Sequence, residues 1–191
     1  MNTSDITALQ QERTLLWHDV PPQTTLDGLA GLVEQNHLQN FCLWHEEDVA
    51  RRDDLGSERV RQAKRAIDRY NQCRNDLIES IDMLLVEELN PSDEGVPFNS
   101  ETPGMMIDRL SILALKKYHM AEEADRANAT EDHRTQSSAK LRVIDRQIDD
   151  LRQALTELLF EVGEGTRSFR VYYQFKMYND AALNPELRKA S

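Results

Sequence analysis

Three residues lie where the helical pattern of this sequence favours apolar side chains, and together they could bind an anion. Arg74 interrupts a heptad-spaced seam within residues 57–89 whose other members are mostly apolar. His37 follows the apolar face of a helix expected from about residue 25, and His119 lies within a mostly apolar helix expected from residue 103. A guanidinium and two imidazoles can hold a carboxylate or phosphate through charge-assisted hydrogen bonds. These three residues are the first candidates for a ligand site.

The helix expected from about residue 25 to the turn at Gly56 carries further candidates on one face. Spaced at 100° per residue, that face begins as ordinary core and becomes polar half-way along. In order, its residues are Leu26, Leu29, Ala30, Val33, His37, Asn40, Phe41, Trp44, Asp48 and Arg51. The change predicts an internal polar site to which Asn40, Trp44, Asp48 and Arg51 contribute.

Antiparallel folding of the helices predicts that His37, Arg74 and His119 share one layer. Turns near residues 55 and 97 place His37 level with Arg74, and Arg74 level with His119, to within about one helical turn. A buried guanidinium requires a paired carboxylate. The candidate partners are Asp48, Asp108 and Asp145. Asp108 lies in the same apolar sector as His119, about 16 Å away along the helix axis, so these two cannot touch.

Two interpretations of this layer stay open at the level of sequence. In the first, Arg74, the two histidines, Asn40 and a carboxylate form a satisfied buried network that fixes the register of the helices. In the second, the same residues surround a pocket that holds a small anionic ligand.

A metal site is not predicted. Glu34-x-x-His37 has the spacing of carboxylate-bridged metal sites in helical bundles, but the sequence has no second motif of this kind. The other histidines, His18, His45 and His133, are assigned to solvated helix flanks, loops or helix ends. Cys42 and Cys73 lack metal-binding spacing, and nucleophile, P-loop and dinucleotide motifs are absent. We therefore expect no metal and no cofactor, and whether the protein is an enzyme stays open.

The charge of the chain restricts its partners. The formal net charge is -11 over 191 residues, which disfavours binding to nucleic acids and to anionic membrane surfaces. No apolar run approaches the roughly 20 residues of a membrane helix. Residues 1–13 lack the basic and apolar sections of a signal peptide. We expect a cytoplasmic protein without membrane insertion.

The expected architecture is one all-α domain built as an antiparallel, up-down-up-down four-helix bundle. Residues 1–23 form an N-terminal arm or short helix that packs onto the body, residues 24–163 the bundle and residues 164–191 an aromatic C-terminal segment packed across it. The helix from residue 103, capped by Thr102, is apolar on most sides and should lie at the centre. The polar residues 127–138 are expected to turn the chain. Phe169 to Met177 alternate with a period of two, which indicates extended chain, but no second strand is apparent.

Four stretches resemble one bacterial family, the domain of unknown function 4254. They are Leu43–Arg52 (LWHEEDVARR), Asn71–Glu79 (NQCRNDLIE), Glu101–Met120 (ETPGMMIDRLSILALKKYHM) and Gln174–Pro185 (QFKMYNDAALNP). The resemblance runs from about residue 35 onward and implies a cytoplasmic bacterial protein with no established activity. It also implies a link to glycosyltransferase and cell-envelope polysaccharide genes. It adds weight to the residues of these stretches that could bind or react: Trp44, His45, Asp48, Arg51, Asn71, Arg74, Asn75, Asp108, Arg109, His119, Lys176, Tyr178 and Asn179.

Three functions are compatible with these observations. The first is an accessory protein that binds a small anionic ligand, such as a sugar phosphate, nucleotide sugar or carboxylate, in cell-envelope glycan synthesis. The second is a helical-bundle enzyme, with or without a metal, acting on such a ligand, with Arg74 as anion holder and His119 as acid or base. The third is a structural or oligomeric interaction protein, a homo-oligomer for example, that uses the aromatic residues of the C-terminal segment.

Overall fold

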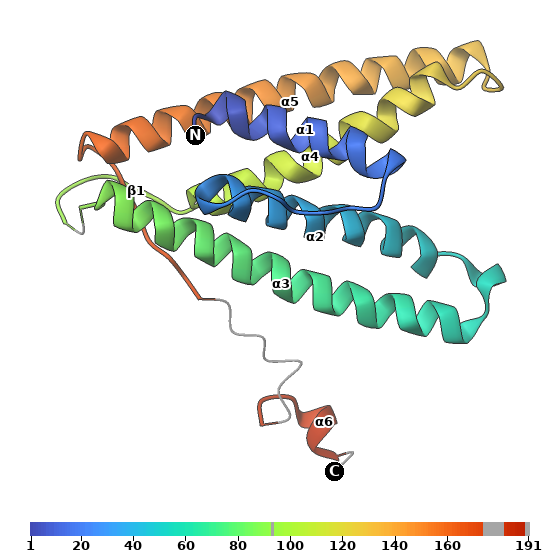
Figure 1. Cartoon of the computed structure of the whole chain (residues 1–191), viewed down its shortest axis with the longest axis horizontal. Coiled ribbons are helices and arrows are strands. Elements are labelled where there is room, and N and C mark those ends of the chain that lie inside the picture. The colour runs from blue at the N-terminus through green and yellow to red at the C-terminus, as the bar shows by residue number, and fades with distance from the viewer. Residues whose placement is uncertain (93, 174–181, 190–191) are drawn as a thin grey trace.

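Helices make up most of the chain. The computed structural model describes residues 1–92, 94–173 and 182–189 (Figure 1). Five long helices occur in these ranges: α1 (Thr3–Asp19), α2 (Gly28–Ala50), α3 (Ser57–Leu89), α4 (Pro103–Asp125) and α5 (Glu131–Gly163). The short elements are the 3-10 turn η1 (Asp53–Leu55), strands β1 (Phe98–Asn99) and β2 (Ser168–Phe169), and helix α6 (Pro185–Lys189). The all-α class is therefore confirmed.

Two antiparallel hairpins form the body of the molecule, α2 with α3 and α4 with α5 (Figure 1). Helix α1 packs against α4, α2 and α5, so it occupies a place among the long helices. Helix α4 contacts all four other long helices, and its expected central position is confirmed. The body is thus an assembly of five long helices, and the simple four-helix bundle is replaced by two hairpins with α1 packed against both.

The segment expected as a short helix or arm packed onto the body is the 17-residue helix α1, and it contributes to both apolar clusters of the core. Ile6 and Trp17 are 1% and 4% exposed. The buried face also contains threonines and a glutamine, so the apolar periodicity of the segment is weak although its burial is strong. The polar members are Thr3, Thr7, Gln10 and Thr14. Gln10 donates a hydrogen bond of 3.0 Å from Nε2 to the carbonyl of Ile107 on α4, which compensates the burial of its amide nitrogen.

Most helix boundaries follow local signals. Thr102 caps α4 by accepting a hydrogen bond from the N–H of Met105, with Pro103 at the first helical position. Helix α2 begins later than expected, at Gly28, because the N–H groups of Thr25 and Leu26 are bound by the carboxylate of Glu34. Helix α5 begins earlier, at residue 131, because its polar first turns are solvated helix and not a turn.

The C-terminal segment is extended where it leaves α5. Residues 168–169 pair in parallel with residues 98–99 to form a two-stranded ladder, and Phe169 is 2% exposed. The expected extended chain is therefore confirmed for β2, and the expectation that it has no partner strand is wrong. Phe175, Lys176, Met177, Tyr178 and Asn179 lie outside the described residues. Tyr172 and Tyr173 are exposed.

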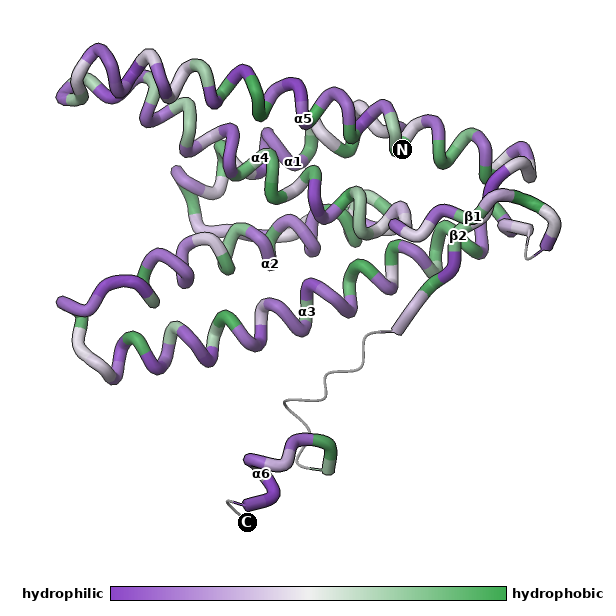
Figure 2. The backbone as a smooth tube through the Cα atoms, turned by 180° about the vertical axis from the view of Figure 1, so that it is seen from behind, coloured by the Kyte–Doolittle hydropathy of each residue, from purple (hydrophilic) through white to green (hydrophobic). Residues whose placement is uncertain are grey.

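The core has two apolar clusters separated by a polar layer. The larger contains Val33 of α2 and Ile107 of α4, and the smaller contains Phe41 and Leu115 of the same two helices together with Trp17. Buried polar residues occupy the positions between these clusters on both helices. Figure 2 shows hydrophobic and hydrophilic residues interleaved along α3 and α5, as expected for helices with one solvated face. None of the described helices is both long and apolar enough to cross a membrane.

Candidate functional site

The polar layer between α2 and α4 is built on Asp108. Asn36 and Asn40, one turn apart on α2, donate hydrogen bonds of 3.1 and 2.9 Å from their amide nitrogens to Oδ1 of Asp108. Asn40 also donates to the hydroxyl of Ser111 at 3.0 Å. All four residues are at most 4% exposed. Because the amides converge on it, the Asp108 carboxylate can be buried here in a fixed orientation.

His37 continues the network toward α1. Its Nδ1 lies 2.7 Å from the hydroxyl of Ser111 and its Nε2 lies 3.0 Å from the hydroxyl of Thr14. Thr14 donates its own proton to the carbonyl of Gln10 at 2.8 Å, so it accepts from Nε2–H, and Nδ1 accepts from Ser111. Burial lowers the pKa of His37 to about 3, which agrees with this neutral, fully bonded ring.

Arg74 of α3 lies on the opposite side of Asp108. Its Nε is 3.4 Å from Oδ1 of Asp108, with side-chain exposures of 26% and 6%. This Nε forms no aligned hydrogen bond within the described residues, so the pair is held by charge. Of the three carboxylates named as candidate partners of Arg74, Asp108 is the one that pairs with it, and the guanidinium is neither deeply buried nor free in solvent.

A groove of about 350 Å³ adjoins Arg74, between α2, α3 and α4. It is lined by Asn40, Leu43, Trp44, Glu47, Asp48, Arg51, Asn71, Arg74, Ile112 and Leu115. Five residues predicted from the sequence, Asn40, Trp44, Asp48, Arg51 and Arg74, therefore share one surface. His37 lies behind it in the buried layer, and Asp108 beneath it. Asp145 pairs instead with Lys117 at 2.9 Å.

The predicted level of His119 is wrong. The carboxylate of Asp82 accepts a hydrogen bond of 2.6 Å from the N–H of Gly104, which sets the register of α3 against α4. Eight residues before Asp82 is Arg74, and eight residues after Gly104 is Ile112. Arg74 therefore faces Asp108 and Ile112, and His119 lies seven residues, about 10 Å, further along α4 than Ile112. The prediction placed a symmetric turn near residue 97. The connection instead contains β1, and α4 therefore begins at a different level relative to α3.

Glu34 has a structural role. Its side chain is 0% exposed and bonds to Nε of Arg13 at 2.6 Å and to the N–H groups of Thr25 and Leu26. Burial raises the pKa of Glu34, but the N–H of Thr25 and the partners Arg13 and Leu26 outweigh it, so the pKa is lowered. The Glu34-x-x-His37 motif therefore places two side chains into separate, satisfied networks.

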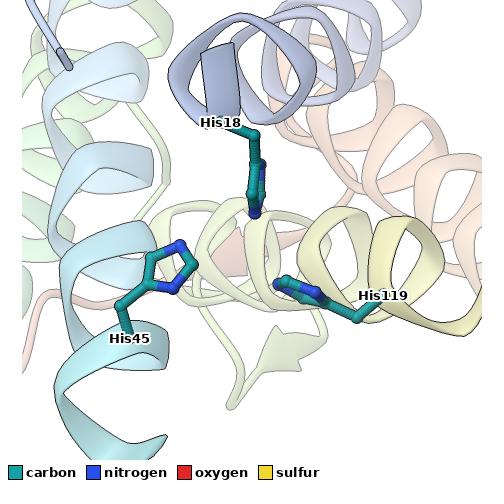
Figure 3. A group of neighbouring side chains, drawn as sticks. All are labelled: His18, His45 and His119. Atoms are coloured by element: carbon teal, nitrogen blue, oxygen red, sulfur yellow. The ribbon is translucent and has the colours of Figure 1, made fainter. Parts of the chain in front are cut away.

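A second polar cluster lies at the far end of the small apolar cluster. His18 of α1, His45 of α2 and His119 of α4 point toward one another (Figure 3). One ligand-capable nitrogen from each ring lies within 4.8 Å of the others. His18 stacks on Tyr118 at 4.0 Å, and His119 stacks on Trp44 at 4.8 Å. Trp44 thus forms a wall of the groove and also contacts the histidine cluster.

The family model described as "Protein of unknown function (DUF4254)" matches residues 30–171. The chain belongs to this family. Searches of curated proteins and of solved structures found no match. The matched range contains the groove, the Asp108 network, His45 and His119. It leaves out His18, and it ends before the stretch at Gln174–Pro185 that resembles the family in the sequence.

Two members of the histidine cluster, His18 and His45, were not predicted as site residues, although the family resemblance adds weight to His45. His18 belongs to the segment interpreted as an arm, and His45 was assigned to a solvated flank. Trp17, stacked on His37 at 5.4 Å, anchors the end of α1 and so brings His18 against α2 and α4. One signal was available in the sequence: each clustered histidine directly follows an aromatic residue, as Trp17-His18, Trp44-His45 and Tyr118-His119.

Proposed function

We propose that this protein binds a small anionic ligand in the groove beside Arg74. The observation that supports the proposal is the placement of one partly exposed guanidinium at the wall of a groove large enough for a small molecule. Pockets for small ligands have volumes of about 300–1,000 Å³, and this groove has about 350 Å³.

Arg74 is prepared to receive an anion. Asp108 lies against Nε, and Asn36 and Asn40 hold that carboxylate in place. Arg74 is 26% exposed at the groove and carries two terminal guanidinium nitrogens. They are the pair of donors that binds a carboxylate or phosphate in a bidentate manner. A ligand would therefore bind to a guanidinium that the charge of Asp108 already holds at the groove.

The other groove residues favour an anion that also carries hydroxyl groups. Glu47 is paired with Arg51 at 2.7 Å, and Asp48 contributes a further carboxylate to the groove. These carboxylates would repel a bare multivalent anion but can accept hydrogen bonds from hydroxyls. Asn71 and Asn40 can both donate and accept. The proposed ligand class is therefore a sugar phosphate, nucleotide sugar or hydroxylated carboxylate, which would link a cytoplasmic bacterial protein to cell-envelope glycan synthesis.

The test is thermal unfolding of the full chain against a panel of sugar phosphates, nucleotide sugars and small carboxylates. A ligand at 100 times its dissociation constant adds about 2.7 kcal/mol, or roughly 5–10 °C for a domain of this size. We expect one anion class to produce this shift in the wild type and in Arg69→Leu, an exposed control on α3. Arg74→Leu should abolish it. The absence of a shift with any compound, or an equal shift in Arg74→Leu, would overturn the proposal.

A specific observation favours the interaction-protein function as a second candidate. The inner half of the layer is satisfied by intramolecular partners, since both ring nitrogens of His37 and the amides of Asn36 and Asn40 are bonded. These residues need no ligand to explain their burial. If the anion panel gives no shift, measurement of the molar mass in solution is the next experiment, because this candidate requires an assembly larger than one chain.

A further inference from the structure

The histidine cluster differs from the Asp108 network in having buried ring nitrogens without partners. Nε2 of His18 and Nε2 of His119 are both buried, and neither has a hydrogen-bond partner in the part of the chain that the structure describes. An unsatisfied buried polar atom destabilises the fold that contains it. Two such atoms in one cluster, facing a third imidazole (Figure 3), indicate that something else belongs between the rings.

The hydrogen bond made by Nδ1 of each ring determines whether its Nε2 carries a proton or a lone pair. Nδ1 of His18 lies 2.6 Å from the carbonyl oxygen of Thr14, and Nδ1 of His119 lies 3.0 Å from Oε2 of Glu122. Carbonyl and carboxylate oxygens only accept, so both Nδ1 atoms carry the proton. In the neutral rings both Nε2 atoms are then bare lone pairs, which cannot bond to each other.

We propose that His18, His45 and His119 bind one divalent transition-metal ion, with Zn²⁺ as the best fit, and leave a coordination position open. The metal would join the end of α1 to α2 and α4. The proposal is independent of any ligand in the Arg74 groove, because none of the three histidines lines that groove.

The spacing of the rings is close to that of a loaded site. Zn–N distances of about 2.0–2.1 Å in tetrahedral geometry place ligand nitrogens about 3.3–3.4 Å apart. The three nitrogens here lie within 4.8 Å of one another. Side-chain rotations that bring the nitrogens roughly 1–1.5 Å closer together would give the spacing of a loaded site.

The ligand set selects the class of metal. Three imidazoles suit Zn²⁺, Cu²⁺, Ni²⁺ or Fe²⁺, whereas Mg²⁺ and Ca²⁺ require oxygen ligands. Structural zinc sites are closed by four protein ligands, but sites with three histidines keep a position for water or a substrate. The cluster therefore resembles the open sites in which a metal acts on a bound molecule, and a metal-bound water is the group it would supply.

Neighbouring groups hold the rings as they do in established metal sites. Ligating histidines usually donate their second N–H to a carboxylate or a backbone carbonyl, and Glu122 and Thr14 supply one of each. Trp44 lies nearly parallel to His119, at an interplanar angle of 7°, and Tyr118 lies nearly parallel to His18, at 20°. Two of the three rings are thus oriented before any ion binds.

The test is a titration of the full, chelator-treated chain with Zn²⁺ by calorimetry, repeated with Co²⁺ and visible absorption. We expect one ion per chain and a Co²⁺ absorption typical of nitrogen ligation in low coordination number. His18→Gln, His45→Gln and His119→Gln should each weaken binding by more than the roughly 10–100-fold typical of changes to a residue that supports a ligand. His133→Gln is the matched control, because His133 also contacts a carboxylate, that of Glu123 at 2.7 Å, but lies outside the cluster.

A further variant protects the test against loss of folding. Glu122 is 55% exposed, so Glu122→Gln should leave the fold intact while weakening Zn²⁺ affinity by roughly 10–100-fold and altering the Co²⁺ spectrum. The proposal is overturned if the wild type binds no Zn²⁺ or Co²⁺. It is equally overturned if the histidine variants bind as tightly as His133→Gln, or if Glu122→Gln changes neither the affinity nor the spectrum.

Discussion

Two polar clusters lie on the same pair of helices, and they differ in how completely their atoms are paired. Around Asp108, the amides of Asn36 and Asn40 and both ring nitrogens of His37 have hydrogen-bond partners. Around His119, two ring nitrogens are buried and bare within the described residues. Burial of polar groups is therefore common to both clusters, and only the second leaves buried lone pairs facing each other.

This difference in pairing distinguishes a network that stabilises the fold from a cluster that is suited to bind a ligand. A buried network whose amide and imidazole nitrogens are bonded is explained by the packing that it permits, and its removal should destabilise the fold. A buried cluster with bare lone pairs is destabilising until something binds, so its removal should cost the fold little. The two clusters share helices α2 and α4, and the comparison can therefore be made within one chain by matched substitutions.

The largest expected effect is at Asp108. Asp108→Ala leaves the amides of Asn36 and Asn40 without an acceptor and the guanidinium of Arg74 without its counter-charge. Removing one partner of a buried charged network costs about 3–5 kcal/mol. Urea unfolding should show this loss in the free energy of unfolding, whereas Asp150→Ala on the exposed face of α5 should change it by less than about 0.5 kcal/mol. Equal losses in the two variants would show that the network does not hold the fold.

Asp82 should make stability depend on pH. Burial raises the pKa of Asp82 to about 6, although its hydrogen bonds with Thr102 and the N–H of Gly104 oppose the rise. The folded state therefore holds this proton more tightly than the unfolded chain, whose Asp has a pKa of about 3.9. The stabilisation is complete below pH about 4 and is lost as pH rises through about 6. At about 1.4 kcal/mol per pKa unit, the loss is roughly 3 kcal/mol.

The measurement is the difference in the free energy of unfolding between the wild type and Asp82→Asn at a series of pH values. Relative to the variant, the wild type should lose stability between pH 4 and 6. Parallel curves would contradict the prediction.

Gly104 tests the register that places Arg74 on Asp108. A Cβ at this position would lie 2.6 Å from the carbonyl oxygen of Ile78 and 2.8 Å from Oδ1 of Asp82. Because a backbone carbonyl cannot move aside easily, Gly104→Ala should force α3 and α4 apart and cost about 1–3 kcal/mol. Gly163→Ala at the end of α5, where the added methyl group meets nothing within 4 Å, is the control for thermal unfolding. If the two variants unfold at the same temperature, the approach of α3 to α4 is not tight here.

The sequence was most informative where apolar periodicity is strong. The bounds of α3, the Thr102 cap and the central position of α4 followed from the pattern of residues, and so did the shared groove of Asn40, Trp44 and Arg74. The burial of helix α1 was underestimated because four of its seven buried residues are threonine or glutamine, whose burial depends on partners such as the carbonyl of Ile107. No periodicity can indicate such a partner.

The histidine cluster could not be predicted because it depends on the relative height of three helices. The level of α4 against α3 is set by the bond between Asp82 and the N–H of Gly104, and the position of α1 by the packing of Trp17 on His37. Both are contacts between residues distant in sequence. An error of two turns in the first was enough to assign His119 to the layer of Arg74.

The smallest expected change in the free energy of unfolding is that of His119→Leu, and this variant tests the difference between the two polar clusters. In the presence of chelator, His119→Leu removes one bare nitrogen, which is favourable, and loses the bond to Glu122 and the stacking on Trp44, which is unfavourable. We expect these contributions to cancel to within about 1 kcal/mol in urea unfolding. His37→Leu is the matched variant and should cost about 2–3 kcal/mol, because it leaves the Ser111 hydroxyl without its acceptor and removes the donor that bonds to Thr14. With Zn²⁺ added, the wild type should gain stability over His119→Leu. If both leucine variants lose the same free energy under chelator, the two clusters are alike and both are structural.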